Sequence, residues 1–176
     1  MSEMNLSEKD ALAAAVEMEK RGYDFFKKTS SEAKDNLARE VFDFLAAEEL
    51  NHIRAIEKFS EEYLSGKSAD GDKTIEDLKA GRPKAAIEQL FRGLAKSAPI
   101  EGADLDAYRF AMDFERKGQE LYRKAEASAQ DPNARKLYAF LVGEEGKHFR
   151  IVESCLLYFD NPEEFFHQRE GWHVEG

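Results

Sequence analysis

The chain has 176 residues, of which 42% are hydrophobic and 35% are charged, and its formal net charge is −10. This composition supplies a packed core for one domain over residues 1–176 and excludes collagen-like and disordered architectures. The acidic balance repels phosphate groups, so neither nucleic acid nor an anionic membrane is an expected partner. One cysteine, Cys155, excludes an internal disulfide and a four-cysteine metal centre. No signal peptide or membrane-spanning run is readable, which predicts a soluble cytoplasmic protein.

Helical periodicity dominates the first half of the chain. The sequence Ser7-Glu8-Lys9-Asp10 resembles a capping box and predicts a helix that continues to about Ser31. A second helix is predicted from Asp35 to Leu64, which completes a hairpin over residues 7–64. The Gly-, Ser- and Asp-rich stretch 65–73 is expected to be a loop. A short helical turn at 74–80 and an amphipathic helix at 83–97 are expected to follow it.

The second half begins after Pro99 and Gly102, which break the pattern. A third helix is predicted over 103–129, and a fourth from Asp131-Pro132 to about Phe159, so that a second hairpin covers 103–159. The same start signal at Asn161-Pro162 predicts a short helix in the tail, 160–176. The tail aromatic residues Phe165, Phe166 and Trp172 can cover the end of their own bundle, which we favour, or pack on a second copy in a homodimer.

The chain repeats itself at an offset of 96 residues. Residues 39–57 and 135–153 are identical at 8 of 19 positions, and residues 15–28 and 111–124 at 4 of 14. Two helical hairpins with one ancestral pattern are the simplest interpretation. The connecting segment, 65–102, is much longer than adjacent antiparallel helices need, and it suits a crossover that runs the length of a four-helix bundle.

Each long helix has one seam of residues spaced alternately by three and four positions, as in helix-bundle packing. The four seams consist of Leu12, Ala15, Glu19, Gly22 and Phe26; Ala38, Phe42, Leu45, Glu49, His52, Ile56, Phe59 and Tyr63; Tyr108, Ala111, Glu115, Gly118, Tyr122 and Ala125; and Ala134, Tyr138, Leu141, Glu145, His148, Val152, Cys155 and Phe159. Each seam is interrupted at one level by Glu or by Glu-x-x-His. These six residues share register across the repeat.

Four carboxylates at one level of a core are costly to bury unless protons or cations neutralise them. Two divalent metals would balance the charges of Glu19, Glu49, Glu115 and Glu145, with His52 and His148 supplying one imidazole to each metal. Glu49 and Glu145 are the expected bridging ligands, because each shares a helix with a histidine ligand. The donor set suits iron or manganese, although zinc is also possible. The alternative is that these residues are exposed or core-edge charges.

Other polar residues are weaker candidates for the site. Glu48 and Glu144 precede the expected bridging ligands and could accept the second ring N–H of a histidine, or could lie on a solvated face. The Tyr122 hydroxyl could reach a ligand carboxylate. The tail pairs Glu164–His167 and Glu170–His173 have no counterpart in the repeat and are expected at the surface.

Glycines occupy equivalent mid-helix positions, Gly22 and Gly118, where glycine costs about 1 kcal/mol relative to alanine. Close helix approach, or space beside the metals for an oxidant, would explain them.

The set Glu19, Glu49-x-x-His52, Glu115 and Glu145-x-x-His148 resembles the two-metal site of the ferritin-like superfamily. The stretches EMEKRGYDFFKK and FLAAEELNHIRAIEKF are most similar to the rubrerythrin branch. The resemblance covers both hairpins. It implies an all-α, ferritin-like, antiparallel four-helix bundle in which these six residues hold two iron ions and form the catalytic site.

Three departures from the family pattern are visible. Rubrerythrins typically have a further glutamate ligand three positions after the third-helix one, where this chain has Gly118, so the six-ligand set is more similar to bacterioferritin. A rubredoxin domain would need four cysteines, so any peroxidase cycle needs an external electron-transfer protein. Leu50 stands where bacterioferritins have a haem-binding methionine, which argues against haem.

The expected function is therefore that of a rubrerythrin-like di-iron oxidoreductase acting in oxidative stress, which reduces hydrogen peroxide or dioxygen. One alternative is a ferroxidase or mini-ferritin that sequesters ferric iron in a closed shell of subunits. Another is a non-catalytic helical metal-binding or interaction protein, with a vestigial or zinc-filled site.

Overall fold

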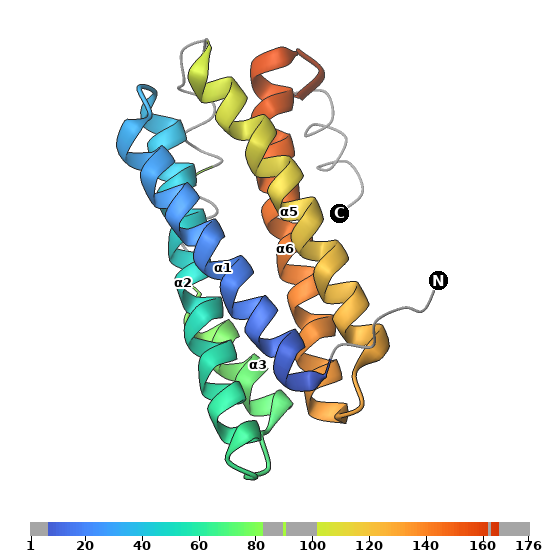
Figure 1. Cartoon of the computed structure of the whole chain (residues 1–176). Coiled ribbons are helices and arrows are strands. Elements are labelled where there is room, and N and C mark those ends of the chain that lie inside the picture. Colours follow the sequence, from blue (N-terminus) through green and yellow to red (C-terminus); the bar gives the residue numbers. More distant parts are fainter. Residues whose placement is uncertain (1–6, 83–89, 91–101, 162, 166–176) are drawn as a thin grey trace.

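The computed structural model describes residues 7–82, 90, 102–161 and 163–165. Its helices are α1 (Glu8–Glu32), α2 (Asn36–Leu64), α3 (Gly71–Ala80), α5 (Ala103–Ser128) and α6 (Pro132–Asp160). The four long ones form an antiparallel bundle of two hairpins, α1–α2 and α5–α6 (Figure 1). α2 ends at the opposite end of the bundle from the start of α5, so their connection crosses the length of the molecule. This confirms the predicted all-α, four-helix architecture.

The repeat extends to the contacts at the hairpin turns. Arg39 Nε donates to the Ala33 carbonyl oxygen at 2.8 Å, and Arg135 Nη2 donates to the Ala129 carbonyl oxygen at 2.6 Å. The two arginines are repeat mates, and Ala33 and Ala129 are the C-cap residues of α1 and α5. Each arginine thus satisfies a carbonyl group that the preceding helix end leaves without an intrahelical partner.

Helix starts follow the capping signals in the sequence. Ser7, Asp35 and Asp131 each accept a hydrogen bond from a backbone N–H of the first turn of the helix that follows. The predicted loop 65–73 is the exception, because α3 begins at Gly71. Asp70 caps this helix by accepting from the backbone N–H of Lys73 at 3.1 Å.

The core consists of two hydrophobic clusters on either side of the polar level. One cluster contains Phe26, Phe42, Leu45, Tyr108 and Val152, and the other contains Leu12, Ile56, Phe59, Leu137 and Leu141. All the predicted seam residues are buried except Tyr63 and Phe159, which are partly buried. The 3-and-4 spacing therefore identified the inner face of all four long helices.

α3 packs against α2 and α6. Lys58 of α2 pairs with Asp77 at 3.0 Å, and Lys136 of α6 pairs with Asp72 at 2.6 Å. The first part of the crossover therefore spans the outside of these two helices. The helix predicted at 83–97 lies outside the described residues except for Leu90, which is helical and buried in the first cluster.

The tail contributes to the core of its own chain. Residues 163–165 are helical, and the Asn161 side chain accepts from the backbone N–H of Glu164 at 3.3 Å. Phe165 is buried, with its ring 5.4 Å from that of Tyr158. This residue packs against the bundle as favoured, whereas Phe166 and Trp172 lie outside the described residues, as do the histidines of the tail pairs.

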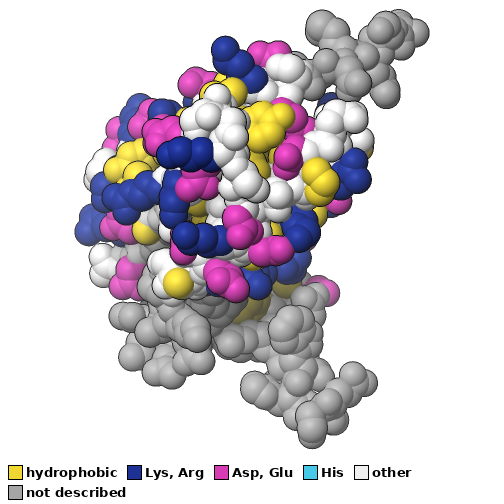
Figure 2. Space-filling view, turned by 90° about the horizontal axis from the view of Figure 1, so that it is seen from below, with side chains coloured by type: hydrophobic (Ala, Val, Ile, Leu, Met, Phe, Trp, Pro, Cys, Tyr) yellow, Lys and Arg dark blue, Asp and Glu magenta, His cyan; other side chains and the backbone are white. Residues whose placement is uncertain are grey.

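The surface seen in Figure 2 carries interspersed Lys, Arg, Asp and Glu side chains with small hydrophobic areas between them. Among the described helices, none combines the length and the apolar character that a transmembrane segment needs.

Candidate metal centre

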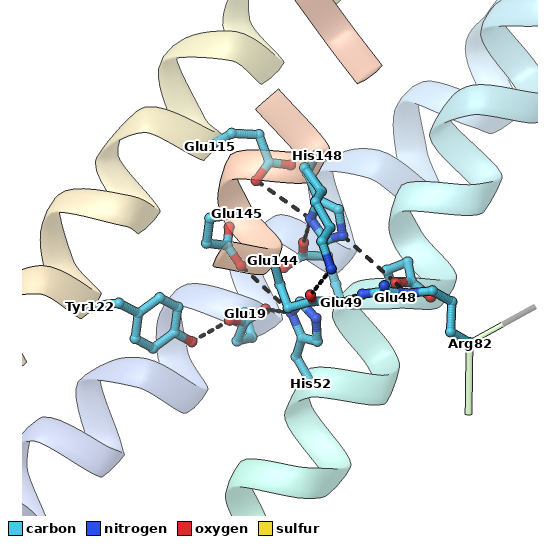
Figure 3. Close-up of polar contacts among 11 residues, drawn as sticks. Glu19, Glu48, Glu49, His52, Arg82, Glu115, Tyr122, Glu144, Glu145 and His148 are labelled. Atoms are coloured by element: carbon cyan, nitrogen blue, oxygen red, sulfur yellow. Dashed lines mark hydrogen bonds and ion pairs between the residues drawn. The ribbon is translucent and has the colours of Figure 1, made fainter. Parts of the chain in front are cut away.

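The six predicted ligand residues converge in the middle of the bundle (Figure 3). α1 contributes Glu19, α5 contributes Glu115, and α2 and α6 each contribute a Glu-x-x-His pair. All six side chains are at most 2% exposed. Their burial excludes the alternative of exposed charges.

The six residues form two sets of four potential ligands. Glu19, Glu49, His52 and Glu145 have ligand atoms within 4.8 Å of one another, and so do Glu49, Glu115, Glu145 and His148. Glu49 and Glu145 belong to both sets. A carboxylate that belongs to two ligand sets is placed where it could bridge two metals, and the bridging role of these two residues stays a prediction.

The pairing across the centre follows the internal two-fold relation of the repeat. His52 Nδ1 lies 3.2 Å from Glu19 Oε2 and 3.6 Å from Glu145 Oε1. His148 Nδ1 lies 3.4 Å from Glu49 Oε1 and 3.6 Å from Glu115 Oε2. The two imidazole rings are nearly parallel, with centroids 5.4 Å apart. Each histidine thus faces a carboxylate of its own hairpin and one of the other hairpin.

Most of the polar atoms at this level lack a hydrogen-bond partner among the described residues. Both carboxylate oxygens of Glu49, Glu115 and Glu145 are unpartnered, as are both ring nitrogens of His148. Buried polar atoms normally have partners, and so many unpartnered acceptors in one place form a site that can hold a cation. Oxygen and imidazole donors in this ratio fit two iron or manganese ions.

The electrostatics of the metal-free site lead to the same conclusion. Burial, followed by the charges of Glu19 and neighbouring carboxylates, raises the pKa of Glu49 and Glu145 well above the ordinary value. Burial raises the pKa of Glu115 to about 8. For Glu19, burial is outweighed by the charge and hydrogen bond of His52 and by the hydrogen bond from Tyr122, so that its pKa falls to about 2. Without metal, protons thus neutralise part of the cluster.

Tyr122 makes the site asymmetric. Its hydroxyl donates a short hydrogen bond to Glu19 Oε1, as the seam position suggested. The repeat mate of Tyr122 is Phe26, which has no hydroxyl, and the oxygens of Glu115 have no hydrogen-bond partner within the described part of the chain. Glu19 is therefore held at both oxygens, whereas its mate Glu115 is not.

The two mid-helix glycines make room for the shared carboxylates. A Cβ atom on Gly22 would lie 2.7 Å from Glu49 Oε2 and 2.8 Å from Phe114 Cε1. A Cβ on Gly118 would lie 2.9 Å from Glu145 Oε2. Close approach, rather than free space for an oxidant, thus explains both glycines. At position 118, the carboxylate of Glu145 occupies the space into which a side chain would extend.

A second polar layer lies outside the ligands, against the crossover. Glu48 and Glu144 are both 2% exposed, and Glu48 Oε2 lies 3.9 Å from His148 Nε2, across the internal two-fold relation. Arg82, from the crossover, donates from Nε to Glu48 Oε2 at 3.1 Å and pairs through Nη2 with Glu144 Oε2. Lys147 donates to Glu144 Oε1 at 2.7 Å. This excludes a solvated face for Glu48 and Glu144.

Arg82 is the site residue that sequence reasoning missed. It stands between Gly81 and Pro83, outside the repeat and outside every helical seam. The available signal was indirect, because two buried acids at equivalent positions need a counter-charge.

We expect Gly22→Ala and Gly118→Ala to weaken binding of a second divalent metal by 10-fold to 100-fold, on the order found for residues that orient ligands. Each new methyl group displaces a carboxylate that belongs to both ligand sets. Titration with Mn²⁺, followed by electron paramagnetic resonance, measures the stoichiometry. The control is Gly143→Ala, at an exposed helical glycine with nothing within 4 Å of the new Cβ, which should leave metal binding intact. Equal binding by all three variants would contradict the close-approach interpretation.

The metal-free protein should lose stability as the pH rises from about 5 to about 8. A carboxyl group whose pKa is higher in the folded than in the unfolded state contributes its full stabilisation when the pH is below the unfolded-state pKa. This contribution is lost as the pH rises through the folded-state pKa, which is about 8 for Glu115. One such group gives a slope of about 1.4 kcal/mol per pH unit. The lowered pKa of Glu19 changes the free energy of unfolding only below about pH 4.5, its ordinary pKa. Urea unfolding in chelator at several pH values tests this, and Glu115→Gln should flatten the slope.

Comparison with known proteins identifies the chain's relatives. A family model described as Rubrerythrin matches residues 10–156, a span that includes all six converging residues and most of both hairpins. Comparisons with curated proteins and with solved structures give no match. The matched family consists of ferritin-like di-iron proteins that are generally oxidoreductases. This match covers most of the chain, and it includes the doubled Glu and Glu-x-x-His pattern whose residues converge in the bundle. The chain therefore belongs to the rubrerythrin family.

Proposed function

We propose that this protein is a di-iron oxidoreductase that reduces hydrogen peroxide with electrons from an external electron-transfer protein. The observation that carries the proposal is the pair of four-ligand sets that share Glu49 and Glu145. Two ferrous ions bound there would supply the two electrons that reduce one peroxide molecule to two water molecules.

Each residue has a distinct role in this proposal. Glu19 and His52 would hold one metal, and Glu115 and His148 would hold the other, with Glu49 and Glu145 available to both. Tyr122 orients Glu19 and keeps a proton at its hydroxyl oxygen, because burial and then the charge of Glu19 raise the tyrosine's pKa well above the ordinary value. Since peroxide reduction consumes two protons, this hydroxyl is a proton donor within the buried site.

The lack of hydrogen bonds to Glu115 is relevant to how the oxidant enters. Tyr122 and His52 constrain Glu19, whereas the Glu115 carboxylate has no comparable hydrogen bond among the described residues. Of the two carboxylates that belong to only one ligand set, Glu115 is thus the one that can rotate with less loss of hydrogen bonding. We infer that an oxidant would approach the centre on the Glu115 side.

The shared carboxylates provide the first test. Wild-type protein should bind two ferrous ions per chain under anaerobic conditions, and Glu49→Ala or Glu145→Ala should bind fewer than two. Colorimetric iron analysis after desalting measures this, with Glu57→Ala on the exposed part of α2 as the control. A Glu49→Ala variant that keeps two irons and normal turnover would contradict the assigned site.

The choice of oxidant separates the proposed reaction from iron storage. Rapid mixing of the di-ferrous protein with equimolar hydrogen peroxide or dioxygen, followed by absorbance, should show faster oxidation by peroxide. Faster oxidation by dioxygen with continued iron uptake would indicate a ferroxidase. Failure to bind iron would exclude both reactions.

Tyr122→Phe restores the symmetry of the repeat and removes the proposed proton donor. We expect it to bind two irons but to reduce peroxide more slowly by 10-fold or more, within the range of general acid catalysis. The matched control is Tyr138→Phe, since that ring stacks on Tyr122 at 6.3 Å while its hydroxyl contacts Glu8 at 3.5 Å. Equal rates for both variants would exclude a role for the Tyr122 hydroxyl.

A further inference from the structure

Arg82 occupies a distinctive place next to the proposed metal centre. Its guanidinium group contacts Glu48 of α2 and Glu144 of α6, which are repeat mates, so a single residue serves both halves of a duplicated site (Figure 3). Each of these acids directly precedes a shared carboxylate residue. The side chain of Arg82 is 19% exposed, and the side chains of the two acids, taken without their backbone, are 3% exposed.

The crossover fixes the position of this guanidinium. Asn51 Nδ2 donates to the Leu78 carbonyl oxygen at 3.1 Å, and Gly81 packs so closely on Asn51 that a Cβ would lie 2.6 Å from Asn51 Oδ1. α3 thereby carries Arg82 to the level of the Glu-x-x-His pair of α2. The residue belongs to the architecture of the crossover and not to the helical repeat.

The charges of the whole cluster balance only when Arg82 is counted. Six carboxylates lie at this level, namely Glu19, Glu48, Glu49, Glu115, Glu144 and Glu145. In ionised form they carry six negative charges. Two divalent metals, Arg82 and Lys147 carry six positive charges, and Lys147 is the more exposed of the two basic side chains, at 46%. Arg82 is therefore the better shielded protein cation of the site.

We propose that Arg82 is the fixed counter-cation of the two-metal centre, which holds Glu48 and Glu144 outside the ligand set and tunes the reduction potential of the bound metals. This inference rests on the proposed function. Arg82 is a positioning residue, because it acts through Glu48, which lies beside His148 Nε2, and through Glu144. Its positive charge disfavours the oxidised metals more than the reduced ones, since the oxidised pair carries more charge. Removing that charge should make the potential more negative.

The test compares Arg82→Gln with a variant that removes the same charge elsewhere. Arg116→Gln is the matched control, because Arg116 also pairs with two carboxylates, Asp113 and Glu120, but at an exposed position on α5. Redox titration of the iron-loaded protein should give a potential that is more negative in Arg82→Gln and unchanged in Arg116→Gln. Arg82→Lys should stay close to the wild type.

A double variant shows whether charge is the cause. Arg82→Gln/Glu144→Gln removes one charge of each sign, so its potential should return toward that of the wild type. Urea unfolding of the metal-free proteins gives a second measurement, in which Arg82→Gln should be less stable than Arg116→Gln and Glu144→Gln should restore part of the loss. If Arg82→Gln is too unstable to load iron, the unfolding of the metal-free proteins decides the matter, because a double variant no more stable than Arg82→Gln would contradict the counter-charge role.

The outcomes distinguish this proposal from the proposed function. A wild-type chain that binds no iron would overturn both. A wild-type chain that binds two irons, with Arg82→Gln and Arg116→Gln at the same potential, would overturn the role of Arg82 alone. A double variant that keeps the shifted potential of Arg82→Gln would show that the shift does not come from charge balance and would also overturn it.

Discussion

The cost of burying carboxylates in a helical core constrains the rest of this structure. Four glutamates lie at one level of the bundle with virtually no exposure to solvent, and two more lie directly outside them. Such a cluster is tolerable only if protons, metals or basic side chains neutralise it. The raised pKa values of Glu49, Glu115 and Glu145 show that protons can neutralise part of it, and the two ligand sets can hold metals. Arg82 and Lys147 are the basic side chains beside it.

The hydrophobic core is arranged around this constraint. Two separate clusters lie above and below the polar level, so the bundle does not depend on apolar packing where the ligands meet. Gly22 and Gly118 leave the space that the shared carboxylates fill. The approximately 1 kcal/mol that a mid-helix glycine costs is thus linked to a specific contact at each position.

Duplication accounts for the symmetry of the site, and departures from it indicate where its two halves differ. His52 and His148 have equivalent carboxylate neighbours, as expected for two copies of one hairpin. Tyr122 and Phe26 break this equivalence beside Glu19 and Glu115. Arg82 breaks it differently, because one residue from the non-repeated crossover serves both Glu48 and Glu144. The two ligand sets therefore contain the same residue types but have different surroundings.

The sequence by itself determined the four long helices, their inner faces and the six converging residues. This was possible because helix periodicity places every third or fourth residue on one face, and because a duplicated pattern at a fixed offset seldom arises by chance. It also indicated that Tyr122 could reach a ligand, since two helical turns separate it from Glu115. Only the tertiary structure decided that Tyr122 bonds Glu19 of the other hairpin and that the glycines accommodate carboxylates. It also revealed Arg82, because that residue reaches the site through the path of an irregular crossover, which no periodic pattern encodes.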